Sequence, residues 1–122
     1  MNDEPVKQVI WVGSSLENLK SFPDAVKDSA GYALHLIQQG KTPKSAKPLK
    51  GFKPKVMEIV TDYNTDTYRS IYSVKIDDLV YVLHCFQKKS KTGIKTPKNE
   101  LELIKQRLKE AEILSKEMRG NL

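Results

Sequence analysis

The chain has 122 residues, of which 39% are hydrophobic and 30% are charged, a composition typical of one small globular domain. Its formal net charge of +6 favours an anionic partner such as nucleic acid, a membrane surface or an acidic protein. A single cysteine excludes an intramolecular disulfide, and no apolar run reaches the roughly 20 residues of a membrane span. We therefore expect a cytoplasmic protein, with residues 1–122 forming one domain and no membrane partner.

The first 40 residues predict one strand and two helices. An apolar run over residues 7–12 predicts a strand that ends at Gly13. Apolar residues at helical spacing then predict a short helix before Pro23 and a second helix from Pro23 to about Gly40.

The next stretch, residues 41–55, is basic and rich in proline. It contains no acidic residue, and its prolines predict a stiffened loop rather than a helix or strand. Its lysines are Lys41, Lys44, Lys47, Lys50, Lys53 and Lys55.

Three strands and a helix complete the chain. Strands are predicted at residues 56–62, 68–76 and 79–87, and their short connections favour an antiparallel meander. Residues from about Pro97 to Met118 predict a helix with one apolar stripe. The charged residues of this helix are expected to be solvated: Glu100, Glu102, Lys105, Arg107, Lys109 and Glu110.

This order predicts an α+β fold in which a small, mainly antiparallel sheet is packed by N-terminal helices and a C-terminal helix. If the helices gather on one face of the sheet, the other face is open and is the place to look for a site.

The most informative segment lies at the end of the last strand. The apolar run from Leu79 to Leu83 leads directly into a stretch dense in lysine, with Lys88, Lys89, Lys91 and Lys95. A buried strand holds such cations at the rim of a sheet, where they suit a polyanion and its phosphates.

Alternation along the three strands offers a candidate site. One consistent assignment places Glu58, Arg69, His84 and Lys88 on the same open face. Arg69 and Lys88 suit binding of a phosphate, and His84 suits proton transfer near neutral pH. Glu58 suits the role of a base, so this set could cleave RNA through the 2′-hydroxyl.

Simpler interpretations remain open for each residue. A histidine in an apolar strand is more often structural than catalytic, and Glu58 with Arg69 could form only a cross-strand ion pair. The lysines that follow the last strand could be only a solvated loop. The two histidines and one cysteine do not predict a metal site.

Three segments carry a family resemblance: Pro48–Phe52, Tyr68–Val74 and Val82–Pro97. In that order and spacing they resemble the phage-derived HigB-like branch of the RelE/ParE toxin superfamily, from about Val9 to Leu114. The resemblance implies a RelE-like fold and the toxin of a type II toxin–antitoxin pair. It also implies a metal-independent, ribosome-dependent mRNA endoribonuclease (an mRNA interferase) without a cofactor. Its partners would be mRNA, the ribosome and a cognate antitoxin, often of the helix-turn-helix type.

The resemblance also assigns roles to single residues. Arg69 falls where RelE-type enzymes place a phosphate-binding arginine, and Lys88 or Lys89 falls at their basic position after the last strand. Glu58 and Val60 stand where lysines are common in RelE-type enzymes, and Ile94 lies near the expected position of their late tyrosine. The predicted catalytic set is therefore Arg69, His84, Lys88 and Lys89, with Glu58. The predicted RNA-binding lysines are Lys47, Lys50, Lys53, Lys55, Lys91 and Lys95.

Two other functions fit the same fold. One is inhibition of gyrase in the manner of ParE toxins, and the other is binding of nucleic acid without catalysis, since a fold alone does not fix a target.

Overall fold

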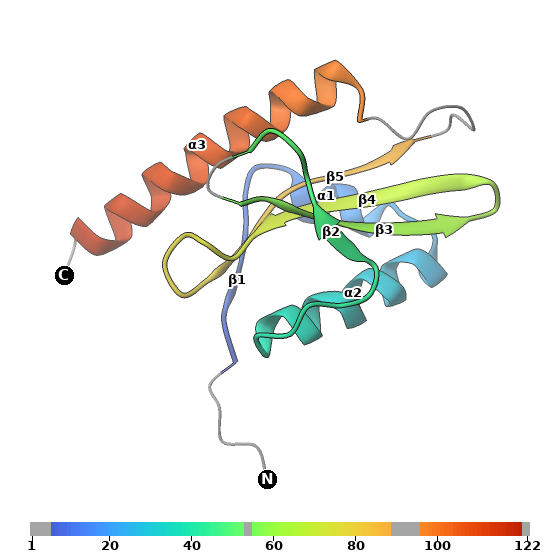
Figure 1. The fold of residues 1–122 in the computed structure, drawn as a ribbon, viewed down its shortest axis with the longest axis horizontal. Helices are drawn as coiled ribbons and strands as arrows, with labels where there is room; N and C mark the ends of the chain where they lie inside the picture. The colour runs from blue at the N-terminus through green and yellow to red at the C-terminus, as the bar shows by residue number, and fades with distance from the viewer. Residues whose placement is uncertain (1–5, 53–54, 89–95, 121–122) are drawn as a thin grey trace, which may run out of the picture.

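The computed structural model describes residues 6–52, 55–88 and 96–120. Its helices are α1 (Ser15–Lys20), α2 (Asp24–Gln38) and α3 (Lys98–Gly120). Its strands are β1 (Val9–Trp11), β2 (Ala46–Pro48), β3 (Met57–Tyr63), β4 (Asp66–Ser73) and β5 (Val80–Lys88). The predicted α+β fold is confirmed, and Figure 1 shows the helices and strands in their spatial arrangement.

The strands form one five-stranded sheet in the order β1-β5-β4-β3-β2. β1 pairs with β5 in parallel, and the other three pairings are antiparallel. Two of these, β3 with β4 and β4 with β5, form the predicted meander. The β3–β4 hairpin turns at Asn64 and Thr65, whose φ angles of 48° and 69° are both positive, as a two-residue type I′ turn demands.

Helices cover both faces of this sheet, so the prediction that they gather on one face is wrong. α1 and α2 pack on one face, over a core that includes Ile59, Tyr72 and Val82, while α3 packs on the other, over Ile71 and Leu83 (Figure 1). The reason lies in the central strands, because β5 is buried at seven consecutive residues from Val80 to Phe86. A strand that is apolar on both sides needs a cover on both sides.

The predicted loop at residues 41–55 contains a short strand, β2, that the sequence did not reveal. Lys47 in β2 lies opposite Glu58 in β3, and Pro48 lies opposite Met57. β2 is an edge strand, where a proline is tolerated because one side of the strand makes no ladder hydrogen bonds.

An irregularity in β5 changes which side chains share a face. Ile71 of β4 pairs with His84, but Tyr72 pairs with Val82, so Leu83 is an extra residue in β5. Strict alternation places Val82 and His84 on one face, and that prediction is wrong. Val82 belongs to the core under α1 and α2, whereas His84 contacts α3.

Among the described residues, no helix combines the length and apolar character that crossing a membrane requires.

Candidate functional site

Arg69 and Glu58 form an ion pair inside the protein. Glu58 lies on β3 and Arg69 on the neighbouring strand β4, and Nη1 of Arg69 donates to Oε1 of Glu58. Each residue is only 4% exposed. A buried arginine and carboxylate must be paired to be tolerated, and here each neutralises the other.

His84 makes a second polar contact, with the first turn of α3. Its Nε2 lies 2.8 Å from Oε1 of Glu100, and its ring stacks on Phe86 at 5.1 Å between centroids and 19° between planes. His84 is 5% exposed, and its Nδ1 has no hydrogen-bond partner among the described residues. Glu100 was predicted to be solvated, but it turns toward the sheet and holds the imidazole.

The strand register brings these groups onto one face, as predicted. Arg69 lies opposite Phe86, and His84 lies opposite Ile71, so Arg69 and His84 are diagonal neighbours across β4 and β5. Lys88 follows on the same strand, opposite Thr67, and is half-buried. The face is not open as predicted, however, because Glu58, Arg69 and His84 are buried and this face is covered by α3 together with Leu49 and Phe52 of the segment that follows β2.

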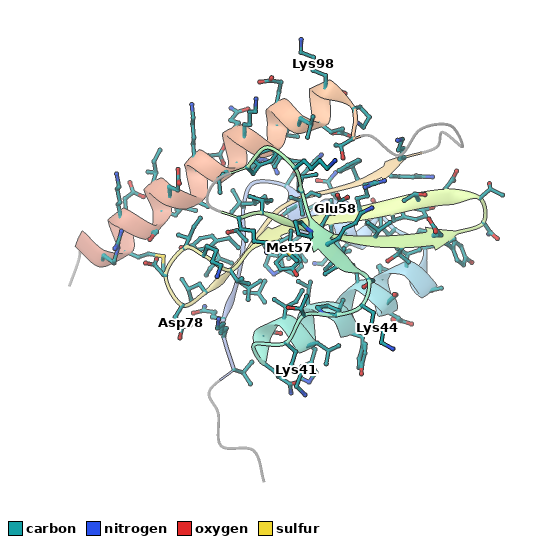
Figure 2. All side chains as sticks on the ribbon, viewed as in Figure 1. Lys41, Lys44, Met57, Glu58, Asp78 and Lys98 are labelled. Atoms are coloured by element: carbon teal, nitrogen blue, oxygen red, sulfur yellow. The ribbon has the colours of Figure 1, made fainter. Side chains whose placement is uncertain are left out.

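The predicted RNA-binding lysines that the structure describes are exposed. Lys47 lies on β2, Lys50 lies just before Gly51, and Lys55 precedes β3. Figure 2 shows the neighbouring Lys44 side chain at the edge of the molecule beside α2. The remaining predicted site lysines lie outside the described residues: Lys53, Lys89, Lys91 and Lys95.

Arg107 was also predicted to be solvated, and this too is wrong. Its guanidinium donates to the carbonyl oxygens of Leu83 at 3.0 Å and Val12 at 3.3 Å, and to Oγ of Ser14 at 3.2 Å. Arg107 thereby ties α3 to the β5 irregularity and to the loop after β1. The sequence carried no clear signal of this, because the helical pattern gives the apolar stripe but not which flanking charges turn inward.

The arrangement can supply two functions of an RNA-cleaving site. A carboxylate that holds one nitrogen of an imidazole fixes the orientation of the ring, and the other nitrogen is then available to move a proton. A guanidinium one diagonal step away suits a phosphate.

Cys85 is not part of this chemistry. Burial raises the pKa of its thiol to about 11, so the nucleophilic thiolate is absent near neutral pH. In the described part of the chain, no cluster of three or more histidine, cysteine or acidic side chains could hold a metal ion.

The sequence matches a known protein family over most of its length. The model of the family described as phage-derived protein Gp49-like (DUF891) matches residues 17–109, a range that contains Glu58, Arg69, His84, Glu100 and Arg107. This family belongs to the RelE/HigB-like group of toxins, and membership suggests the toxin of a toxin–antitoxin system. No curated protein matches the chain. Because the match covers most of the sequence, the chain belongs to the phage-derived Gp49-like family.

Proposed function

We propose that this protein is the toxin of a type II toxin–antitoxin system and that it cleaves translated mRNA on the ribosome. The observation that carries the proposal is the family match, because this family lies within a toxin group. The step to RNA is supported by the strand register, which gathers Arg69, His84 and Lys88 on one sheet face.

The contacts favour a division of roles within this set. His84, held by Glu100, would accept the proton of the attacking 2′-hydroxyl, and Arg69 with Lys88 or Lys89 would stabilise the charge that grows on the phosphate. Glu58 is better suited to hold Arg69 than to act as the base, because its carboxylate already accepts from the guanidinium.

Burial sets a condition on this mechanism. Arg69 and His84 are buried on the sheet face that carries α3, so RNA can reach them only if the cover at this end of the sheet moves. The Glu100 side chain is 23% exposed, compared with 7% for the His84 side chain. The first turn of α3 is therefore where we expect RNA to enter.

The proposal includes partners and a compartment. mRNA and the ribosome are the targets, and the exposed lysines Lys47, Lys50 and Lys55 would contact their phosphates in a salt-dependent way. In the cytoplasm, a cognate antitoxin of the helix-turn-helix type would cover the surface that carries these three lysines. The reaction uses no metal and no cofactor.

A reconstituted translation mixture with one defined mRNA tests this proposal. The wild type should produce new 5′ ends inside the translated region, and His84→Gln should cut about 100-fold more slowly or worse, as expected for loss of an acid–base group. Glu102→Gln is the matched control, because Glu102 is an exposed carboxylate on the same helix, and it should cut within twofold of the wild type. Intact mRNA, or His84→Gln cutting at the wild-type rate, would overturn the proposed mechanism.

Burial of the ion pair favours a second candidate, a toxin or accessory protein that binds nucleic acid without cutting it. In that case Glu58 and Arg69 have only a structural role, in which each prevents the other from being an unpaired buried charge. Such a protein would retain RNA in a binding assay while leaving it intact. A ParE-like gyrase inhibitor would instead block supercoiling by purified gyrase.

A further inference from the structure

A pocket of about 180 Å³ opens on the sheet face that carries α2, away from the Arg69–His84 site. Among the residues that the structure describes, four lysines line it, Lys7, Lys41, Lys55 and Lys75, and no acidic residue does. Its apolar wall is formed by Ile37, Met57, Tyr72 and Val74. The pocket is several times larger than the roughly 30 Å³ that one water occupies in the liquid, so an oxyanion could fit with part of its hydration shell.

The backbone at each of these lysines is held by hydrogen bonds. Lys7 N–H donates to the carbonyl of Gln38 at 2.9 Å, and Gln38 Nε2 donates to the carbonyl of Lys7 at 2.8 Å. Oγ of the buried Ser73 donates to the carbonyl of Lys55 and accepts from the N–H of Lys75, both at 3.3 Å. The lysines therefore come from separate segments that are locked together, unlike those of a solvated loop.

The end of α2 positions the fourth lysine. Gly40 has a φ of +84°. Its N–H donates to the carbonyl of Ile37 at 2.9 Å, and the N–H of Lys41 donates to the carbonyl of Leu36 at 3.0 Å. This is a Schellman motif, which reverses the chain and sets Lys41 beside the end of the helix (Figure 2). It also satisfies carbonyls at the negative end of the helix dipole, which would otherwise repel an anion.

In the described part of the chain, one of these four lysines, Lys7, has an acidic partner. Asp78, in the loop between β4 and β5, lies 3.5 Å from Nζ of Lys7 with its side chain 89% exposed, and it does not line the pocket. Such an exposed pair contributes little and is screened by salt. Lys41, Lys55 and Lys75 are exposed, so solvent screens their mutual repulsion, and an anion in the pocket would lower it further.

Tyr72, which also lines the pocket, carries a hydroxyl that stays neutral. The residue is 2% exposed, and burial raises the pKa of its hydroxyl to about 12, so the hydroxyl stays protonated at neutral pH. A protonated hydroxyl can donate to an oxyanion, as the ammonium groups do.

From this geometry we infer that the pocket of Lys7, Lys41, Lys55, Lys75 and Tyr72 binds a phosphate group. The group is either a phosphate of an RNA chain or that of a small free phosphate ester. The site lies on the opposite sheet face from Arg69 and His84, so it does not depend on the proposed cleavage chemistry.

Amide NMR titrations of the full chain at constant ionic strength test the inference. Inorganic phosphate should shift the amides of Lys41, Thr42, Val74 and Lys75 in a saturable way. Lys41→Gln/Lys75→Gln should weaken this binding at least tenfold. Lys20→Gln/Lys44→Gln removes the same charge from exposed residues outside the pocket and should stay within twofold of the wild type. Shifts that do not saturate, or equal affinities for both double variants, would overturn the inference.

A second titration, with one RNA oligonucleotide, identifies the source of the phosphate. If RNA binds more tightly than inorganic phosphate and loses at least tenfold in Lys41→Gln/Lys75→Gln, the pocket holds an RNA phosphate. If inorganic phosphate binds as tightly as RNA, the pocket holds a free phosphate ester. Neither titration measures cleavage. The phosphate pocket can therefore be disproved while the proposed mRNA cleavage stands, and the cleavage can be disproved while the pocket stands.

Discussion

At the scale of single residues, substitutions of Glu58 or Arg69 affect stability as well as activity, because the two side chains form a buried ion pair. Removing one partner leaves a buried charge unpaired, which typically costs about 3–5 kcal/mol of unfolding free energy, whereas replacing both with apolar residues is often nearly neutral. Loss of activity in Arg69→Met alone therefore does not separate a catalytic role from unfolding.

We therefore predict that Arg69→Met lowers the free energy of unfolding by several kcal/mol and that Glu58→Leu/Arg69→Met recovers most of the loss. Urea unfolding followed by circular dichroism measures both. A double variant as unstable as the single one would show that the two side chains do not act as a pair.

Gly13 is a residue whose conformation and surroundings both require glycine. Its φ is +57°, and an added Cβ would lie 2.5 Å from Cζ of Arg107. We predict that Gly13→Ala costs about 1–3 kcal/mol in urea unfolding. Gly31 is the control, because it lies exposed in α2 with nothing near its missing Cβ. Gly31→Ala should stabilise by about 0.5–1 kcal/mol, and equal stability of the two variants would contradict the account.

Cys85 should make stability depend on alkaline pH. Burial raises the pKa of its thiol from 9.0 to about 11, so its contribution is complete below pH 9 and is lost as the pH rises toward 11. Between pH 8 and pH 10 we expect this group to lower the free energy of unfolding by about 1.4 kcal/mol. The free energy of unfolding of Cys85→Ala should therefore fall less between pH 8 and pH 10 than that of the wild type. Equal decreases in the two proteins would show that the thiol does not contribute.

At the scale of secondary-structure elements, α3 is held to the sheet by polar contacts as well as by its apolar stripe. Arg107 reaches two carbonyls and one hydroxyl, and Glu100 reaches His84. Both residues look like ordinary surface charges in the sequence, because the helical pattern gives the apolar stripe but not which flanking charges turn inward.

Removing Arg107 should therefore loosen α3. We predict that Arg107→Met lowers the free energy of unfolding by about 1–3 kcal/mol, because the carbonyl of Leu83 loses a charged donor. Lys109→Met removes an exposed charge from the same helix and should stay within about 0.5 kcal/mol of the wild type. Equal effects of the two substitutions would count against the anchoring role of Arg107.

The sequence predicted the long elements and missed the subtle ones, for physical reasons. Helical spacing and apolar runs predicted α2, α3 and the three long strands close to their observed bounds. β2 was not predicted, because an edge strand of three residues has little periodicity and its proline argues against a strand. The extra residue at Leu83 was not predicted, because a bulge depends on how two strands pair and not on composition.

At the scale of the whole molecule, the sheet is covered on both faces and carries a distinct polar feature on each. Glu58, Arg69 and His84 are buried on the face that carries α3, and the lysine pocket opens on the side of α2. Alternation could predict that the first three share a face, but not that this face is covered, because the sequence does not say on which face α3 packs. The pocket was unpredictable, since its lysines come from four separate segments.

The central claim is that this fold serves a toxin that cuts translated mRNA. Induced expression in bacteria without an antitoxin, with mapping of 5′ ends on an abundant mRNA, tests it most directly. The comparison is between the wild type and Glu58→Leu/Arg69→Met, which should remain folded but lack the arginine that we propose binds phosphate. Growth arrest with new cuts inside translated regions, absent in the double variant, is the predicted result. Growth arrest with intact mRNA, or no arrest at all, would contradict the claim.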